Sequence, residues 1–271
     1  MSAAIRQARS KDGTLVAGEL VGAGIPVLLV HGTSSARGRW APVLATMSER
    51  LQLCLMDRRG RGLSGDGAEH SLAAEVADVA ALAREAGARV LIGHSFGAIC
   101  ALEAARDLPD LQAVVLYEPP VPVPPVAPDP VDAANIRRIG EQAAAGWSEE
   151  AVLTFMRDVL AMPAAQIEAA RKSPGWGERV ALAPTLSREL AAVRAYHFGA
   201  GRFTELTVPV LVLLGGESPQ RYVDAAHLVA DGLPNAHLGL LPGQRHTAIT
   251  EAPDLFASKV MAFLDERLVS A

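Results

Sequence analysis

Cysteine is scarce in this chain of 271 residues, which contains only Cys54 and Cys100. Both lie in apolar stretches, so we predict two buried, reduced thiols rather than a disulfide, as is typical of cytoplasmic proteins. No spacing of cysteine and histidine resembles a zinc site. We therefore expect a cytoplasmic protein with no metal and no cofactor.

The chain also has no basic tract, and its formal net charge is −5. This argues against a nucleic-acid or anionic-membrane partner. No apolar run approaches the roughly 20 residues of a membrane span, and residues 1–15 contain no apolar core of a secretory signal. The expected partner is a small-molecule substrate. The sequence leaves open whether the chain is a monomer or a homo-oligomer.

Short apolar runs rich in Val, Ile and Leu alternate with helical patterns such as residues 71–87. The runs mostly lack polar alternation, which is typical of strands buried on both faces of a parallel sheet. They are residues 26–32, 51–57, 88–95, 111–118, 208–216 and 236–243. Segments 3–9 and 14–22 flank "KDG" and predict a hairpin at a sheet edge. The pattern predicts an α/β fold with a mainly parallel sheet of about eight strands.

One region interrupts this alternation. Seven prolines lie between Pro119 and Pro130, and residues 131–200 then show helical patterns without a convincing strand. We predict a stiff, extended proline link that leads into a helical insertion between two late strands. The expected organisation is a core of residues 1–120 and 207–271, with a helical cap over 121–206.

Ser95 lies in "GHSFG", after a strand-like run and before a helical pattern. A tight strand-to-helix turn exposes such a serine and needs small neighbours, which Gly93 and Gly97 provide. A serine hydroxyl requires a base to act as a nucleophile. His246 follows the last predicted strand, so its loop opens at the same sheet edge as Ser95. These positions predict a serine nucleophile with a histidine base.

The motifs "HGTSS" (31–35), "DRRGRGLS" (57–64), "GHSFG" (93–97) and "GQRH" (243–246) together resemble the cap-bearing branch of the α/β-hydrolase superfamily. The resemblance covers about two-thirds of the chain. It implies an oxyanion hole formed by the backbone N–H groups of Thr33 and Phe96. Ser34 and Ser35 either add a hydroxyl donor to this oxyanion hole or stabilise the turn and cap the helix that follows. For Asp57 and Arg58 the resemblance implies a structural role in their loop.

The third member of the site should be a carboxylate that orients His246. Where the family usually has an aspartate, after the next-to-last strand, this chain has Ser218, and Glu217 is one residue away. Some relatives carry the acid after the strand that follows the nucleophile helix, where this chain has Glu118. We favour Glu118, expected to be held extended by Pro119, and keep Glu217 as the alternative.

Aromatic residues make up 4% of the chain, and several fall in or near the predicted cap. Most of them are expected to pack cap helices. Trp147 and Trp176 lie in glycine-bearing turns and are candidates for the rim of a substrate pocket, with Trp40 and Ser34 near the oxyanion loop.

We therefore expect a serine hydrolase that cleaves an ester, thioester or lactone of a small, largely apolar substrate through an acyl-enzyme. Two alternatives stay open. One is a ligand-binding or signalling module with slow turnover. The other is a different activity on the same residues, such as C–C hydrolysis, peptide hydrolysis or a cofactor-free haloperoxidase-like reaction.

Overall fold

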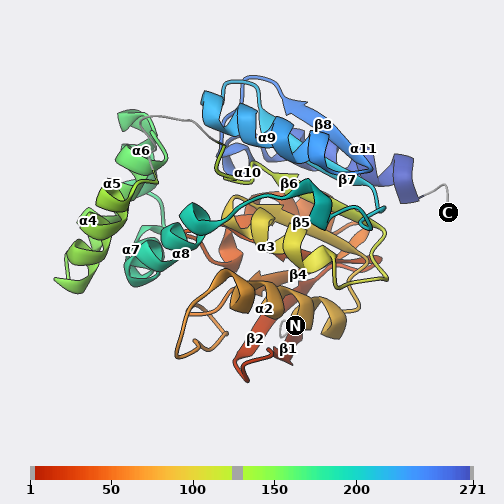
Figure 1. Cartoon of the computed structure of the whole chain (residues 1–271), viewed down its shortest axis with the longest axis horizontal. Coiled ribbons are helices and arrows are strands. Elements are labelled where there is room, and N and C mark those ends of the chain that lie inside the picture. The colour runs from red at the N-terminus through yellow and green to blue at the C-terminus, as the bar shows by residue number, and fades with distance from the viewer. Residues whose placement is uncertain (1–3, 124–130, 269–271) are drawn as a thin grey trace. The chain divides into compact units, whose positions relative to one another are not determined.

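The computed structural model describes residues 4–123 and 131–268 (Figure 1). Its centre is an eight-stranded sheet with the order β1-β2-β4-β3-β5-β6-β7-β8. The strands are β1 (Ala4–Arg9), β2 (Leu15–Val21), β3 (Ile25–Val30), β4 (Leu51–Asp57), β5 (Val90–His94), β6 (Ala113–Tyr117), β7 (Val210–Gly215) and β8 (Ala236–Leu241). Only the pairs β1–β2 and β2–β4 are antiparallel. The predicted α/β fold and edge hairpin are confirmed.

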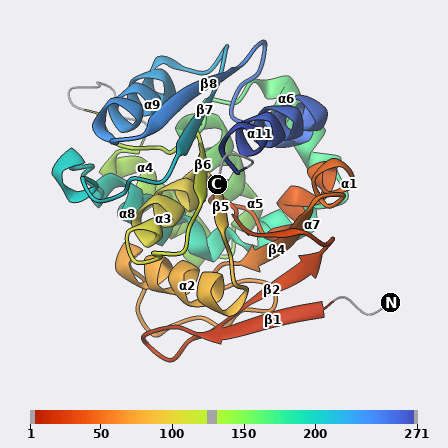
Figure 2. The ribbon, with the colours of Figure 1, turned by 90° about the vertical axis from the view of Figure 1, so that its right-hand side faces the viewer.

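Helices cover both faces of this sheet. They are η1 (Arg37–Val43), α1 (Leu44–Met47), α2 (Leu72–Glu85), α3 (Phe96–Ala105), η3 (Ala200–Arg202), α9 (Gln220–Gly232), α10 (Ala248–Glu251) and α11 (Pro253–Leu268). Figure 2 shows α2, α3 and α9 on one side of the strands and α1 and α11 on the other. Helix α2 begins at Ser71, whose hydroxyl accepts a hydrogen bond from the Ala74 N–H, and Gly87 follows its end with φ of 61°. Serine and glycine are common at these two ends of a helix.

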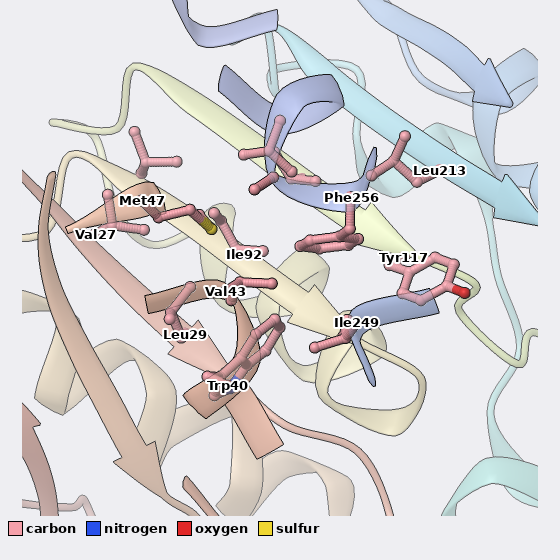
Figure 3. Close-up of a cluster of buried hydrophobic side chains, with 14 of the residues drawn as sticks. Val27, Leu29, Trp40, Val43, Met47, Ile92, Tyr117, Leu213, Ile249 and Phe256 are labelled. Carbon is pink, nitrogen blue, oxygen red and sulfur yellow. The ribbon is translucent and has the colours of Figure 1, made fainter. Parts of the chain in front are cut away.

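A large hydrophobic cluster fills the space between the strands and α11 (Figure 3). Alternate strand residues such as Val27 and Leu29 point into it, because successive side chains of a strand face opposite sides. Trp40 packs in this cluster at 0% exposure, with its ring centroid 6.3 Å from that of Phe256. The expectation that Trp40 contacts the substrate is therefore corrected, since a side chain without accessible surface belongs to the core.

The chain separates into two compact units, and the second comprises residues 33–35 and 124–196. Its helices are α4 (Ala133–Ala144), α5 (Ser148–Thr154), a π-helical turn η2 (Phe155–Val159), α6 (Ala164–Arg171), α7 (Trp176–Ala181) and α8 (Ala183–Ala195). They pack around their own apolar cluster, which includes Ile139, Phe155 and Leu186. The unit is shorter than the insertion predicted at 121–206, because 121–123 and 197–206 group with the sheet. Most of the proline link lies outside the described residues.

Both cysteines, Cys54 and Cys100, are buried thiols, as the sequence predicted. Burial raises the pKa of the Cys54 thiol to about 12, so this group stays protonated at neutral pH. Within the described ranges, no helix is both long and apolar enough to cross a membrane.

Candidate active site

Ser95 lies in a strained turn between β5 and α3. The strand ends at His94, the helix begins at Phe96, and Ser95 between them has φ of 54° and ψ of −127°. Few non-glycine residues adopt a positive φ, and such strain is concentrated at functional sites. The turn is anchored to the next strand by the Ser95 N–H, which donates to the Tyr117 carbonyl at 2.9 Å. The backbone thus fixes where the serine side chain begins.

Two glycines make this turn sterically possible. A Cβ atom on Gly93 would lie 2.5 Å from Cα of Ala98, and one on Gly97 would lie 2.3 Å from the carbonyl oxygen of Val30. Both distances are far below contact distance, and the opposing atoms are backbone. The prediction that these two positions must lack side chains is confirmed.

His246 and Glu118, which are 128 residues apart, meet at the carboxyl ends of the strands. Nδ1 of His246 and Oε2 of Glu118 are 2.6 Å apart, and the Glu118 side chain is fully buried. Since a carboxylate only accepts, the proton of the neutral imidazole is assigned to Nδ1. Nε2 is then left with a lone pair, which is the state required of a general base.

The other carboxylate oxygen of Glu118 is held by the end of β7. Oε1 accepts a hydrogen bond from the Gly215 N–H at 2.8 Å and another from the Ser218 hydroxyl. Glu118 follows β6 with φ of 46°, so the expectation that Pro119 holds it extended is wrong. The turn at the strand end sets this conformation, and it directs the carboxylate toward β7 and His246.

Glu217, the alternative acid, is not brought to the imidazole. Its side chain is 62% exposed, and its carboxylate lies 3.9 Å from Nε of Arg245. A surface ion pair of this kind contributes little to the stability of the fold. The geometry therefore favours Glu118 over Glu217 as the acid.

Three aromatic side chains pack around the imidazole of His246. The rings of His94 and Tyr222 each lie 4.6 Å from it between centroids, and Nε2 of His94 is 3.0 Å from the His246 carbonyl oxygen. Tyr117 donates its hydroxyl to the Arg245 carbonyl and accepts from the Ala248 N–H. Both the ring and the backbone of the histidine loop are thereby fixed. Because His94 directly precedes Ser95, the contact also links the histidine loop to the serine turn.

The buried position of His94 affects its charge. Burial, and after it the neighbouring His246 and Arg39, hold the pKa of His94 well below its usual value. His94 is therefore neutral at physiological pH, and its Nε2 carries the hydrogen that it donates to the His246 carbonyl.

The other predicted site residues lie on several different elements. Phe96 is the first residue of α3 and is fully buried, and Thr33 and Ser34 form a turn after β3 in which Ser34 has φ of 56°. Trp147 precedes α5 and is 66% exposed. Trp176 opens α7 and packs on the apolar cluster of the helical unit. Substrate contact by Ser34, Trp147 and Trp176 remains a prediction.

Sequence reasoning did not identify the residues that hold the acid and the base. In the sequence Ser218 marks the position where the usual aspartate is absent, and in the structure its hydroxyl binds the carboxylate of Glu118, the candidate acid. Nothing in the pattern of α9 marks Tyr222 as a neighbour of His246, because that contact depends on the packing of α9 beside β7 and β8.

Comparison with known proteins agrees with this fold. A family model described as "Alpha/beta hydrolase family" matches residues 27–259. An α/β hydrolase of known structure from Sphaerobacter thermophilus is 33% identical, with a TM-score of 0.84 over 96% of this chain and 100% of that one. The chain belongs to the α/β-hydrolase family and is an enzyme of that type.

Two curated relatives match over shorter segments. N-formylmaleamate deformylase of Pseudomonas putida is 37% identical over 108 residues, which are 38% of this chain and 40% of the relative. Pimeloyl-[acyl-carrier protein] methyl ester esterase of Xanthomonas campestris is 33% identical over 98 residues, which are 36% of this chain and 38% of the relative. Each alignment thus spans about two-fifths of the relative's length.

Proposed function

We propose that this chain is a serine hydrolase that cleaves a carboxylic ester, thioester or lactone of a small, largely apolar substrate. Ser95 is the proposed nucleophile, His246 the base and Glu118 the acid. The observation that carries the proposal is the hydrogen bond between Glu118 and Nδ1 of His246. It leaves Nε2 as an acceptor at the sheet edge that also presents Ser95.

The register of the sheet supports the proximity of these groups. His94 of β5 pairs with Tyr117 of β6. Ser95 directly follows His94, and Glu118 directly follows Tyr117. In parallel strands the carboxyl ends open on the same side, which is where ligands bind in such sheets. Ser95 and Glu118 are therefore neighbours along one edge.

In the proposed reaction, Nε2 of His246 takes the proton of the Ser95 hydroxyl as its oxygen attacks the substrate carbonyl. The backbone N–H groups of Thr33 and Phe96 are the proposed donors to the oxyanion. The leaving group departs with the proton from His246. A water molecule, activated by the same base, then hydrolyses the acyl-enzyme. Glu118 stabilises the imidazolium in both steps.

The test is covalent labelling together with turnover. The wild-type protein should react with a fluorophosphonate probe and hydrolyse members of a panel of p-nitrophenyl esters, whereas Ser95→Ala should do neither. Mass spectrometry should locate the adduct on Ser95. Equal ester turnover by the wild-type and Ser95→Ala proteins, or an adduct at another residue, would overturn the proposal.

A second candidate is hydrolysis of a C–N bond by the same residues. It is favoured by the similarity to N-formylmaleamate deformylase, whose name describes removal of a formyl group from nitrogen. The two candidates differ in the leaving group that His246 must protonate. Comparing kcat/KM for an ester and for the matched N-formyl amide distinguishes them, and a higher value for the amide would favour the second candidate.

A further inference from the structure

Arg58, in the loop after β4, is fully buried, although it lies outside the three side chains proposed to react. Its Nη1 donates to the Glu75 carboxylate at 3.0 Å, and the Glu75 side chain is itself fully buried. Burying a charged pair is costly, and its replacement by apolar residues is often neutral or stabilising. The position of this guanidinium therefore calls for a reason beyond its contribution to stability.

The second terminal nitrogen of the guanidinium reaches the loop after β3. Nη2 of Arg58 donates to the Gly32 carbonyl at 3.4 Å, and Nδ1 of His31 lies 2.9 Å from the same oxygen. Nε2 of His31 accepts from the Arg58 backbone N–H at 3.3 Å. Because Nε2 accepts, Nδ1 must carry the hydrogen and donate it to Gly32. One carbonyl oxygen is thus held by two donors.

This arrangement fixes the direction of an N–H group. The Gly32 carbonyl and the Thr33 N–H belong to one peptide unit, which is planar and trans, so they point in opposite directions. Holding the carbonyl toward Arg58 and His31 turns the Thr33 N–H away from them. A Cβ on Gly32 would lie 2.8 Å from Cβ of Ser95, so this peptide unit begins beside the serine.

The same guanidinium also covers Phe96. Its Cζ lies 4.8 Å from the centroid of the Phe96 ring, a cation–π distance, and Phe96 is fully buried. The backbone N–H of Phe96 is the second proposed oxyanion donor. Arg58 therefore contacts both residues that border the proposed oxyanion hole, Gly32 through its carbonyl and Phe96 through its ring.

We propose that Arg58, held by Glu75, is a positioning residue for the oxyanion hole: it fixes the Gly32–Thr33 peptide and the Phe96 side chain in the orientation that aims both N–H groups at the oxyanion. This inference rests on the proposed function. It gives Arg58, the first arginine of "DRRGRG", a role in catalysis that is carried by backbone amides rather than by its own contact with substrate.

The test is Arg58→Lys, which keeps a cation for Glu75 but loses the planar fork that reaches Gly32 and covers Phe96. We expect kcat for the best p-nitrophenyl ester to fall on the order of tenfold to a hundredfold, somewhat less than the loss of a whole oxyanion donor. KM should change little, and the pH profile, which reports His246, should not move. A tetrahedral-adduct inhibitor such as a trifluoromethyl ketone should lose affinity in proportion to kcat/KM.

Arg59 supplies the matched control. It is the adjacent residue and is equally buried, and its guanidinium binds both oxygens of Asp78 at 2.7 Å. No contact of Arg59 with Gly32 or Phe96 is found among the described interactions. Arg59→Lys should lower the melting temperature with kcat nearly unchanged, while Arg58→Lys should lower kcat at a temperature where both variants are folded.

Phe96→Leu keeps the backbone donor but removes the ring under the guanidinium. It replaces Arg58→Lys as the test variant if Arg58→Lys does not fold. We expect a several-fold loss of kcat and of inhibitor affinity. Wild-type kcat and inhibitor affinity in folded Arg58→Lys, or in Phe96→Leu where the former does not fold, would overturn the positioning role. A wild-type protein without ester turnover or fluorophosphonate labelling would instead overturn the proposed function.

Discussion

At the scale of single residues, the two oxygens of Glu118 have different partners. Oε1 is held by the Gly215 N–H and the Ser218 hydroxyl, and Oε2 faces Nδ1 of His246. Because the carboxylate is fixed on one side, its other oxygen defines the tautomer and the orientation of the imidazole. A neutral amide of the same shape would fill the space without that effect.

Glu118→Gln should therefore lower kcat/KM for esters by roughly 10³- to 10⁴-fold. The amide nitrogen can donate to Nδ1, which moves the imidazole proton to Nε2 and removes the acceptor that Ser95 needs. Steady-state kinetics on the p-nitrophenyl panel measures the loss. Glu217→Gln is the control and should keep wild-type activity, and the reverse ranking would mean that Glu217 is the acid.

Ser218→Ala should have a smaller effect. The Gly215 N–H still holds Oε1 of Glu118, so we expect kcat to fall by only about threefold to tenfold, which corresponds to the roughly 1 kcal/mol that a typical hydrogen bond contributes. The same kinetic assay checks this. A loss as large as that of Glu118→Gln would show that the hydroxyl has a more direct role than holding the carboxylate.

The sequence placed Glu118 and His246 on the correct strand ends, because strands read as apolar runs and their carboxyl ends share one edge. The extended conformation predicted for Glu118 is wrong, since the preference of a residue before proline is overridden by the turn at the end of β6. Trp40 was misassigned because composition does not distinguish a core aromatic from a pocket aromatic. The contact of Arg58 with Gly32 joins distant loops, and no local pattern encodes it.

At the scale of elements, the turn from β5 to α3 shows how closely strand, helix and loop are packed. The helix begins one residue after Ser95, the proposed nucleophile, and the carbonyl of Val30 on β3 lies where a side chain of Gly97 would be. Three elements meet within van der Waals distance at this point. The positions of Gly93 and Gly97 are therefore set by packing.

Gly97→Ala should lower the free energy of unfolding by roughly 3 kcal/mol, at the upper end for overpacking, because the opposing atoms are backbone and cannot rotate away. Urea denaturation followed by circular dichroism measures the change. Gly38→Ala is the control, since nothing lies within 4 Å of the added methyl group, and its stability should stay within about 0.5 kcal/mol of wild type. Equal stabilities of the two variants would contradict the packing argument.

At the scale of the whole molecule, His94 couples stability to pH. Its folded-state pKa lies well below the ordinary value near 6.5 that it has in the unfolded chain. Between these two values the unfolded chain binds a proton that the folded protein does not. The free energy of unfolding should therefore decrease as pH falls below about 6.5, by up to about 1.4 kcal/mol per pH unit from this group.

His94→Gln should reduce that dependence while it keeps a donor near the His246 carbonyl. Urea unfolding between pH 5 and 7 gives the slope of the free energy of unfolding against pH for both proteins. We expect the wild-type slope to exceed that of the variant by up to about 1.4 kcal/mol per pH unit, the value for one proton. Groups common to both proteins cancel in the difference. Equal slopes for the two proteins would mean that protonation of His94 does not contribute to the pH dependence of stability.

The hydrogen bond between Ser218 and Glu118 has a consequence for how such an enzyme can change over generations. The side chain at position 218 already reaches the carboxylate of Glu118, and it stands where the family usually has its aspartate, so we expect an acid introduced there to reach the same imidazole. Two substitutions would then transfer the acid from one strand to its neighbour without rebuilding the fold. The barrier is the intermediate with two carboxylates, whose mutual repulsion would keep one of them protonated.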